Sequence, residues 1–184
     1  MAVNLSARQF CDERLLCRVE EALDRAELKP TDLELEITES LTARNPDEAL
    51  RILNALRASG VRLMIDDFGT GYSSLASLKR FPVDGLKIDR AFVRNLPEDR
   101  RDAAITRAII ALAQELDLEL VAEGVETPEQ KEFLTRLGCG LIQGYLTGAP
   151  QPPERLRAVL RKGYFLPART AVSLEPVITS SMIP

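Results

Sequence analysis

The chain has 184 residues, of which 45% are hydrophobic and 28% are charged, as expected for a globular protein with one sizeable core. Its net charge of -4 argues against a large non-specific nucleic-acid surface, so no DNA partner is expected. It contains no histidine, so carboxylates, lysine, amides, tyrosine or the three cysteines must supply any acid-base or metal-binding chemistry.

The first half of the chain alternates between strand and helix patterns. Strands are predicted over residues 2–5, 33–38 and 61–66, and helices over 11–26, from Pro46 to Gly60, and over 73–80. The residues over 33–38 alternate between apolar and polar, which is the period of a strand. Asn45 is typical of a helix cap, and Pro46 of a first helical residue.

The second half continues the same alternation. Strands are predicted over residues 85–89, 118–125 and 141–145, and helices over 102–116, 128–137 and 153–162. In the helix over 102–116, the residues expected on the buried face are Ile105, Ile109, Leu112 and Leu116. Residues 164–184 show no clear period, and we expect a tail that is disordered or bridges to another domain.

Six strand-helix pairs in succession predict a parallel α/β sheet with right-handed crossovers. A doubly wound sheet and a (β/α)8 barrel both fit this order. The first strand is not followed by a glycine-rich phosphate fingerprint, and polar residues stand at every strand end, which favours the TIM-type barrel. Six strands cannot close an eight-stranded barrel, so we expect an incomplete barrel that lacks two strands at its N-terminal side.

Polar side chains gather at the six predicted strand ends, and in the middle strands they alternate with residues that pack on helices. They are Asn4, Glu36, Asp66, Asp67, Lys87, Asp89, Glu123 and Gln143. Carboxylate and amide oxygens suit Mg²⁺ or Mn²⁺, and the adjacent pair Asp66-Asp67 would allow a carboxylate to bridge two metals, as in phosphoryl transfer. Each residue alone also fits a solvated strand end, a turn or a surface ion pair.

Other features of the sequence concern the membrane and the cellular compartment. No apolar run approaches the roughly 18 residues of a membrane span, and no signal peptide is recognisable at the N-terminus. The three cysteines form no CxxC motif, which indicates a reduced, cytoplasmic compartment.

The chain resembles the EAL domain family of bacterial cyclic di-GMP phosphodiesterases. The resemblance extends from Asn4 to about Leu160 and rests on six motifs in order: Asn4-Leu5-Ser6, Leu35-Glu36-Ile37-Thr38-Glu39-Ser40, Asp66-Asp67-Phe68-Gly69-Thr70-Gly71-Tyr72-Ser73-Ser74, Leu86-Lys87-Ile88-Asp89-Arg90, Ala122-Glu123-Gly124-Val125-Glu126 and Gln143-Gly144-Tyr145-Leu146. It implies a variant TIM barrel that hydrolyses cyclic di-GMP to linear pGpG with two Mg²⁺ or Mn²⁺ ions.

The resemblance also implies a role for each matching residue. Residues matching Asn4, Glu36 and Asp66 bind one metal, and those matching Asp66, Asp67 and Glu123 bind the other. Lys87 would contact the attacking water, Gln143 would complete the site, and Glu39 would stabilise the loop after Asp67. That loop is linked to dimerisation in the family, so a homodimer is expected. Asp89, Glu126, Thr70 and Tyr72 are expected to support the ligands or contact substrate.

The chain departs from the family at its N-terminal side. The Glu-Ala-Leu signature carries a metal ligand, but Glu21-Ala22-Leu23 and Glu48-Ala49-Leu50 both fall on predicted helices and do not match it. We therefore expect a domain over residues 1–163 that lacks this segment, with sensory or GGDEF domains upstream in a full-length protein. Two alternatives stay open: an inactive module that binds cyclic di-GMP or another protein, and a fragment of an active enzyme.

Overall fold

The computed structural model describes residues 1–71, 75–152 and 154–157. The chain divides into two units, Met1–Thr147 and Gly148–Pro184. In the second unit residues 154–157 are helical, whereas the rest of the helix predicted over 153–162 and the tail predicted over 164–184 lie outside the described residues. None of the described helices has both the length and the hydropathy that crossing a bilayer requires.

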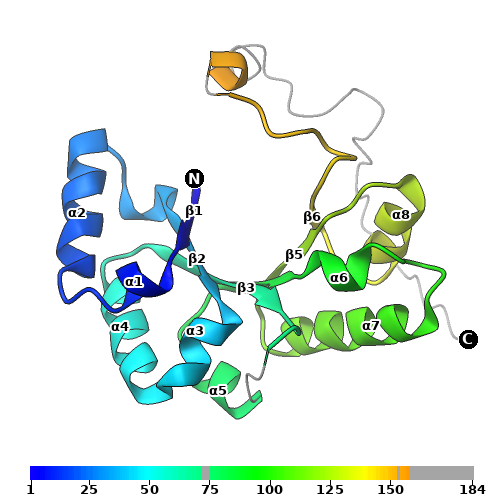
Figure 1. Cartoon of the computed structure of the whole chain (residues 1–184), viewed down its shortest axis with the longest axis horizontal. Helices are drawn as coiled ribbons and strands as arrows, with labels where there is room; N and C mark the ends of the chain where they lie inside the picture. Colours follow the sequence, from blue (N-terminus) through cyan, green and yellow to red (C-terminus); the bar gives the residue numbers. More distant parts are fainter. Residues whose placement is uncertain (72–74, 153, 158–184) are drawn as a thin grey trace, which may run out of the picture. The chain divides into compact units, whose positions relative to one another are not determined.

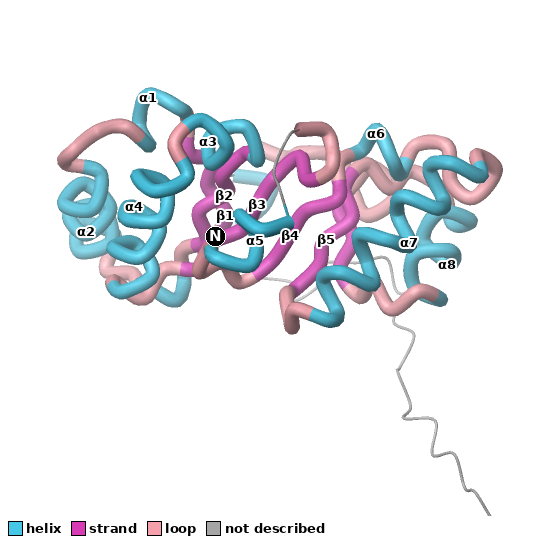
Figure 2. The backbone as a smooth tube through the Cα atoms, turned by 90° about the horizontal axis from the view of Figure 1, so that it is seen from below, coloured by secondary structure: helices cyan, strands magenta, loops and turns pink. Residues whose placement is uncertain are grey.

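The first unit is built on one curved sheet of six parallel strands (Figure 1). The strands are β1 (Ala2–Leu5), β2 (Glu34–Thr38), β3 (Arg62–Phe68), β4 (Gly85–Ile88), β5 (Glu119–Glu123) and β6 (Leu141–Gln143). They neighbour one another in sequence order, and helices connect them along the sheet (Figure 2). This is an incomplete TIM-type barrel, as predicted, and it gathers the carboxyl ends of all six strands along one rim.

Most predicted helices begin and end close to their predicted limits, but three short helices were not predicted and one predicted helix begins late. The helices are α1 (Ala7–Phe10), α2 (Leu15–Ala26), α3 (Glu39–Arg44), α4 (Pro46–Ala58), α5 (Leu75–Arg80), α6 (Arg90–Val93), α7 (Arg100–Glu115) and α8 (Pro128–Arg136), with a 3₁₀ turn at Pro30–Asp32. Helices α1, α3 and α6 were not predicted, because four to six residues are too few to show a helical period. The helix predicted from Cys11 begins only at Leu15.

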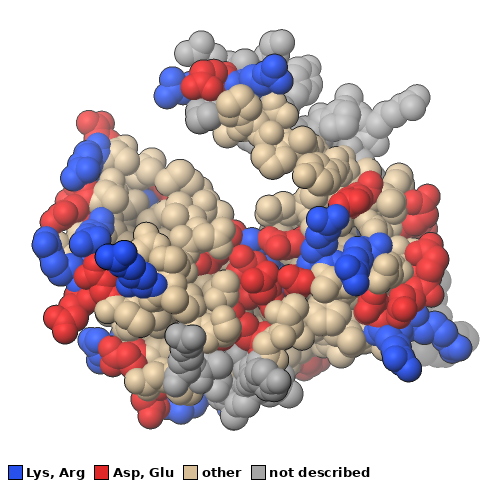
Figure 3. Space-filling model, in the orientation of Figure 1, with Lys and Arg blue, Asp and Glu red and all other residues tan. Residues whose placement is uncertain are grey.

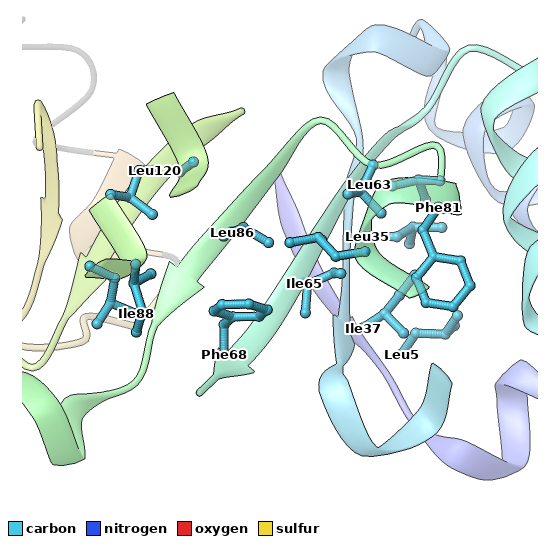
Figure 4. Packing of buried hydrophobic residues seen from close by; sticks show 14 of the residues in the cluster. Leu5, Leu35, Ile37, Leu63, Ile65, Phe68, Phe81, Leu86, Ile88 and Leu120 are labelled. Carbon is cyan, nitrogen blue, oxygen red and sulfur yellow. The ribbon is translucent and has the colours of Figure 1, made fainter. Parts of the chain in front are cut away.

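The hydrophobic core lies between the sheet and its helices. Leu63, Ile65 and Leu86 point to the helix side and are at most 2% exposed (Figure 4). Because side chains alternate across a strand, Met64 and Asp66 point to the other, concave side. Met64 fills that side above Gly85, where an added Cβ would lie 2.7 Å from the Met64 sulfur. The residues at the rim therefore project from a rigid sheet.

Helix α7 buries part of the predicted face, since Ile109 is buried and Leu112 packs partly buried against the core, but the buried face is rotated from the predicted one. Its buried residues are Ala103, Thr106, Ile109, Ile110 and Ala113. Ile105 and Leu116, expected in the core, are 39% and 38% exposed. The helix approaches the sheet through small side chains, and the Thr106 hydroxyl donates to the Phe92 carbonyl at 3.3 Å. A prediction that follows only large apolar residues misplaces such a face.

Candidate metal centre

A β-bulge in β3 places two adjacent carboxylates on the same side of the sheet. The ladder between β3 and β4 is regular up to Ile65 and resumes at Phe68, but only Lys87 fills the same interval in β4. Asp67 has a φ of 55°, a left-handed conformation that Asp adopts more readily than most residues. In a regular strand Asp66 and Asp67 would point to opposite faces, so the bulge is what brings them together.

Asp66, Asp67 and Glu123 form a compact carboxylate group. One oxygen from each of the three lies within 4.8 Å of the others. The Asp67 N–H donates to Asp66 Oδ1 at 3.0 Å, which fixes the Asp66 side chain against the bulge. Acidic side chains gather in the middle of the face shown in Figure 3. Like charges at such separations repel one another and favour a cation among them.

Lys87 of β4 supplies an internal cation for this group. Its side chain is 4% exposed. The Lys87 Nζ lies 2.5 Å from Glu123, 2.9 Å from Glu36 and 3.5 Å from Asp66. Burial alone would lower the pKa of the Lys87 amine, but its hydrogen bonds to Glu123 and Glu36 outweigh burial and raise that pKa. Lys87 is therefore charged at neutral pH and joins strands β2, β3 and β5.

Two of the carboxylates hold their protons more tightly than usual. Burial, a hydrogen bond with Asp89 and the nearby charge of Asp66 raise the pKa of Asp67 to about 6. Burial also raises the pKa of Glu123, although the Lys87 charge opposes it. Both shifts have the same cause, which is negative charge confined where water is scarce.

The loop after β3 is fastened by Glu39, the first residue of α3. Its Oε2 accepts hydrogen bonds from the N–H groups of Gly69 and Gly71, at 2.9 and 3.2 Å. A Cβ on Gly71 would lie 3.1 Å from the Glu39 carboxyl carbon, so a larger residue here would have to displace the Glu39 carboxylate slightly. The Thr70 hydroxyl donates to the Asp67 carbonyl at 2.9 Å. Tyr72, also expected to support the site, lies outside the described residues.

Asn4 and Gln143 stand in the strands at the two sides of this group. Asn4 pairs in register with Glu36 across β1 and β2, and Gln143 pairs with Glu123 across β5 and β6. Both are exposed. The Val125 N–H donates to the Gln143 carbonyl at 3.1 Å, which fixes the backbone of β6 against the segment after Glu123. Both amides are thus placed next to a carboxylate by the sheet register.

Asp89 and Glu126 have different neighbours. Asp89 lies beyond the end of β4, not within the predicted strand 85–89, and caps α6 by accepting from the Ala91 N–H at 2.6 Å. Its carboxylate also contributes to the raised pKa of Asp67. The Glu126 carboxylate pairs with Arg90 at 2.8 Å.

Sequence reasoning missed the bulge and two residues, Arg90 and Gln130. The Gln130 side chain is 4% exposed. It forms a capping box with Thr127 at the start of α8. Its further contact with Arg94 joins residues 36 positions apart, and no local sequence pattern predicts such a contact.

The donor set fits a hard divalent cation. Every side chain within the described cluster offers carboxylate oxygen, which suits Mg²⁺, Mn²⁺ or Ca²⁺ better than softer metals. The fold and this group together define a TIM-type protein with a carboxylate group, suited to a divalent cation, at the carboxyl ends of its strands.

The comparisons with known proteins agree with this class. The EAL domain family model matches residues 1–150. A bifunctional diguanylate cyclase/cyclic di-GMP phosphodiesterase, MucR of Pseudomonas aeruginosa, is 56% identical over 158 residues, which are 86% of this chain and 23% of MucR. The chain thus spans about a quarter of that relative. It belongs to the EAL domain family.

The chain also resembles solved structures. The PaMucR phosphodiesterase in complex with c-di-GMP aligns with a TM-score of 0.82 and 56% identity, over 84% of this chain and 63% of that one. The manganese/cy-diGMP complex of Klebsiella pneumoniae BlrP1 aligns with a TM-score of 0.76 and 35% identity, over 81% of this chain and 38% of BlrP1.

Proposed function

We propose that this chain carries the metal centre of a cyclic di-GMP phosphodiesterase and hydrolyses cyclic di-GMP to linear pGpG. One P–O ester bond of the cyclic dinucleotide breaks, and a water oxygen forms the new bond to phosphorus. The observation that carries the proposal is the bulge, which brings Asp66 and Asp67 to one side with Glu123. Membership of the EAL domain family supports the choice of substrate.

The residues take the following roles in this proposal. Asn4, Glu36 and Asp66 would hold one Mg²⁺ or Mn²⁺ ion, and Asp66, Asp67 and Glu123 a second, with Asp66 between them. When bound, two such ions supply Lewis-acid stabilisation of charge at phosphorus. Lys87 is placed to orient the attacking water, because its ammonium already sits among the ligand carboxylates. Gln143, Glu39, Asp89, Glu126, Thr70 and Tyr72 would hold the ligands or the substrate in place.

The direct test incubates the 184-residue chain with cyclic di-GMP and Mn²⁺ or Mg²⁺ and measures pGpG by chromatography. We expect turnover that EDTA abolishes. Asp66→Asn should reduce turnover at least 100-fold, because it removes the carboxylate shared by both ions, and such groups stabilise the transition state by several kcal/mol. Asp47→Asn is the matched control, since Asp47 is 85% exposed and pairs only with Arg80 among the contacts the structure describes. No metal-dependent pGpG from the wild-type chain would refute the proposal.

A module that binds cyclic di-GMP without cleaving it is the second candidate. The observation that favours it is Lys87, which already neutralises part of the carboxylate group without a metal. Calorimetry distinguishes the two: saturable binding of cyclic di-GMP with no pGpG formed would select the binding module.

We also propose that the domain forms homodimers and belongs to a longer protein with sensory or GGDEF domains. Exposed Ile105 and Leu116 on one side of α7 support the dimer, because both are large apolar residues in contact with solvent. Light scattering should give a mass near twice 20.4 kDa, and Ile105→Glu should return it to the monomer value. A wild-type monomer at high concentration would refute the dimer.

A further inference from the structure

Helix α6 lies between the two segments that carry Asp67 and Glu123. At its start, the cap residue Asp89 accepts from the Ala91 N–H at 2.6 Å. Phe68, which follows Asp67, pairs in register with Ile88, which precedes Asp89, so the start of α6 is joined to the backbone beside Asp67. The Phe92 ring of α6 packs against Gly69, where an added Cβ would lie 2.9 Å from it.

The first turn of α6 contacts the segment that follows Glu123 through the Arg90 side chain. The Arg90 side chain lies directly over Gly124, where an added Cβ would lie 2.3 Å from the Arg90 Cγ. The Arg90 guanidinium then reaches the Glu126 carboxylate at 2.8 Å. Glycine is therefore favoured at Gly124 for two reasons: its φ of 67° is left-handed, and a side chain there would collide with Arg90.

Arg94, the residue following α6, is joined to the same segment by the Gln130 side chain. The Gln130 Nε2 donates to the Arg94 carbonyl at 3.1 Å, and its Oε1 accepts from the N–H groups of Glu126 at 2.7 Å and Thr127 at 3.0 Å. A capping box requires only the bond with Thr127. The bonds to Glu126 and Arg94 go beyond it and join the segment after Glu123 to α6.

We infer that Arg90 and Gln130 are positioning residues that act through α6 to set the separation of Asp67 and Glu123, and thereby the affinity for the divalent cation. The inference rests on the proposed metal centre. Neither residue is a ligand. Both hold the segment 124–127, so a ligand carboxylate at Glu123 stays aligned with Asp67 before any cation arrives. Supporting residues of this kind commonly contribute 10- to 100-fold to metal affinity.

The test measures Mn²⁺ binding to the full chain by calorimetry, so the readout does not depend on catalysis. Gln130→Met keeps the side-chain length and removes all three hydrogen bonds, and we expect its Kd for Mn²⁺ to rise at least tenfold. Gln114→Met is the matched control. Gln114 also donates to a backbone carbonyl near a helix end, that of Leu137 at 3.1 Å. However, Gln114 lies in α7, and Leu137 lies at the C-terminal end of α8, opposite the end that carries Gln130. Its Kd should stay within twofold of wild type.

Arg90→Met provides a second test that does not depend on a buried residue. The Arg90 side chain is 60% exposed, so the variant should fold, and Met still covers Gly124 while losing the pair with Glu126. We expect about tenfold weaker Mn²⁺ binding. Wild-type affinity in folded Arg90→Met, or equal losses in Gln130→Met and Gln114→Met, would overturn the inference while leaving the metal centre intact. A wild-type chain that binds no Mn²⁺ would overturn both.

Discussion

At the scale of single residues, the Lys87 ammonium supplies the positive charge that balances part of the carboxylate group when no metal is bound. Three acidic side chains contact its ammonium, and the side chain is almost fully buried. Removing one partner of a buried ion pair leaves charge uncompensated and typically costs about 3–5 kcal/mol. Lys87 thus acts as an internal counter-ion, and an incoming divalent cation must compete with it for the same oxygens.

The first prediction concerns Lys87→Met. In EDTA the variant should unfold at a free energy about 3–5 kcal/mol below wild type. Mn²⁺ should restore more stability to it than to wild type, because the competing positive charge is gone. Thermal unfolding with and without Mn²⁺ measures both effects, and Lys79→Met on the exposed side of α5 is the control. Equal Mn²⁺ shifts in variant and wild type would show that Lys87 and the metal do not compete.

The second prediction concerns the backbone at Asp67. Its left-handed conformation is accessible to Asn but costs a β-branched residue about 1–2 kcal/mol or more. Asp67→Asn and Asp67→Val should therefore both lose metal affinity, whereas only Asp67→Val should lose stability by about that amount. Urea unfolding in EDTA measures the difference. If the two variants were equally stable, the left-handed conformation would not constrain this position.

At the scale of elements, the short α3 serves the loop after β3. Its first residue, Glu39, accepts the N–H groups of Gly69 and Gly71, so α3 and the loop are held as one piece. Hydrogen bonds to a charged acceptor are worth about 1.5–3 kcal/mol each. The loop follows directly on Asp67, and its order therefore bears on the proposed metal centre.

The third prediction is that Glu39→Gln loosens this loop. Gln keeps one acceptor oxygen but loses the charge, so the amides of Gly69 and Gly71 should exchange faster with deuterium. We expect Mn²⁺ affinity to fall about tenfold. Glu48→Gln in the first turn of α4 is the control, since the Glu48 side chain is 47% exposed and pairs with Arg51, so the change should alter neither measurement. Unchanged exchange at both glycines would show that the Glu39 hydrogen bonds do not hold this loop in place.

How far the sequence predicted these elements depended on their length. All six strands, the longer helices and the six-residue α5 were foreseen. The ends were less certain: β3 was expected to finish at Asp66 but extends to Phe68. Helix α6 was not foreseen at all. Four residues carry no period, and its cap, Asp89, was assigned to the preceding strand.

The candidate site was predicted as a set of residues but not as a geometry. Parallel strands bring their carboxyl ends to one rim, and this alone places Glu36, Lys87 and Glu123 together. The sequence predicted that Asp66 and Asp67 serve one site, but not how both reach the same side of the sheet, because strand alternation sends neighbours to opposite faces. Only the pairing of β3 with β4 reveals the bulge, and pairing between distant segments is not a local property of a sequence.

At the scale of the whole described sheet, the strands differ in how well they are protected. The central strands carry fully buried Leu63, Leu86 and Ile88. The outermost strands of the described sheet, β1 and β6, each have one neighbour there. They also expose Val3 at 39% and Leu141 at 46%.

The fourth prediction follows from this contrast. Amides of β3 and β4 should exchange with deuterium only on global unfolding. Those of β1 and β6 should exchange through local openings that cost less free energy. Mass spectrometry of peptides covering each strand measures the order. Equally slow exchange in all six strands would indicate that the outer strands are covered, for example by a second copy of the chain.

The bulge has one more consequence for the molecule as a whole. Without Asp67, Phe68 would follow Asp66 directly, and the alternation of core-facing and rim-facing side chains in β3 would be regular. Asp67 is thus an insertion that the hydrophobic pattern does not need. The sheet could exist without this residue, but the carboxylate group could not. Folding and the proposed chemistry are therefore encoded separately within a single strand, and either could change in evolution or design while the other is kept.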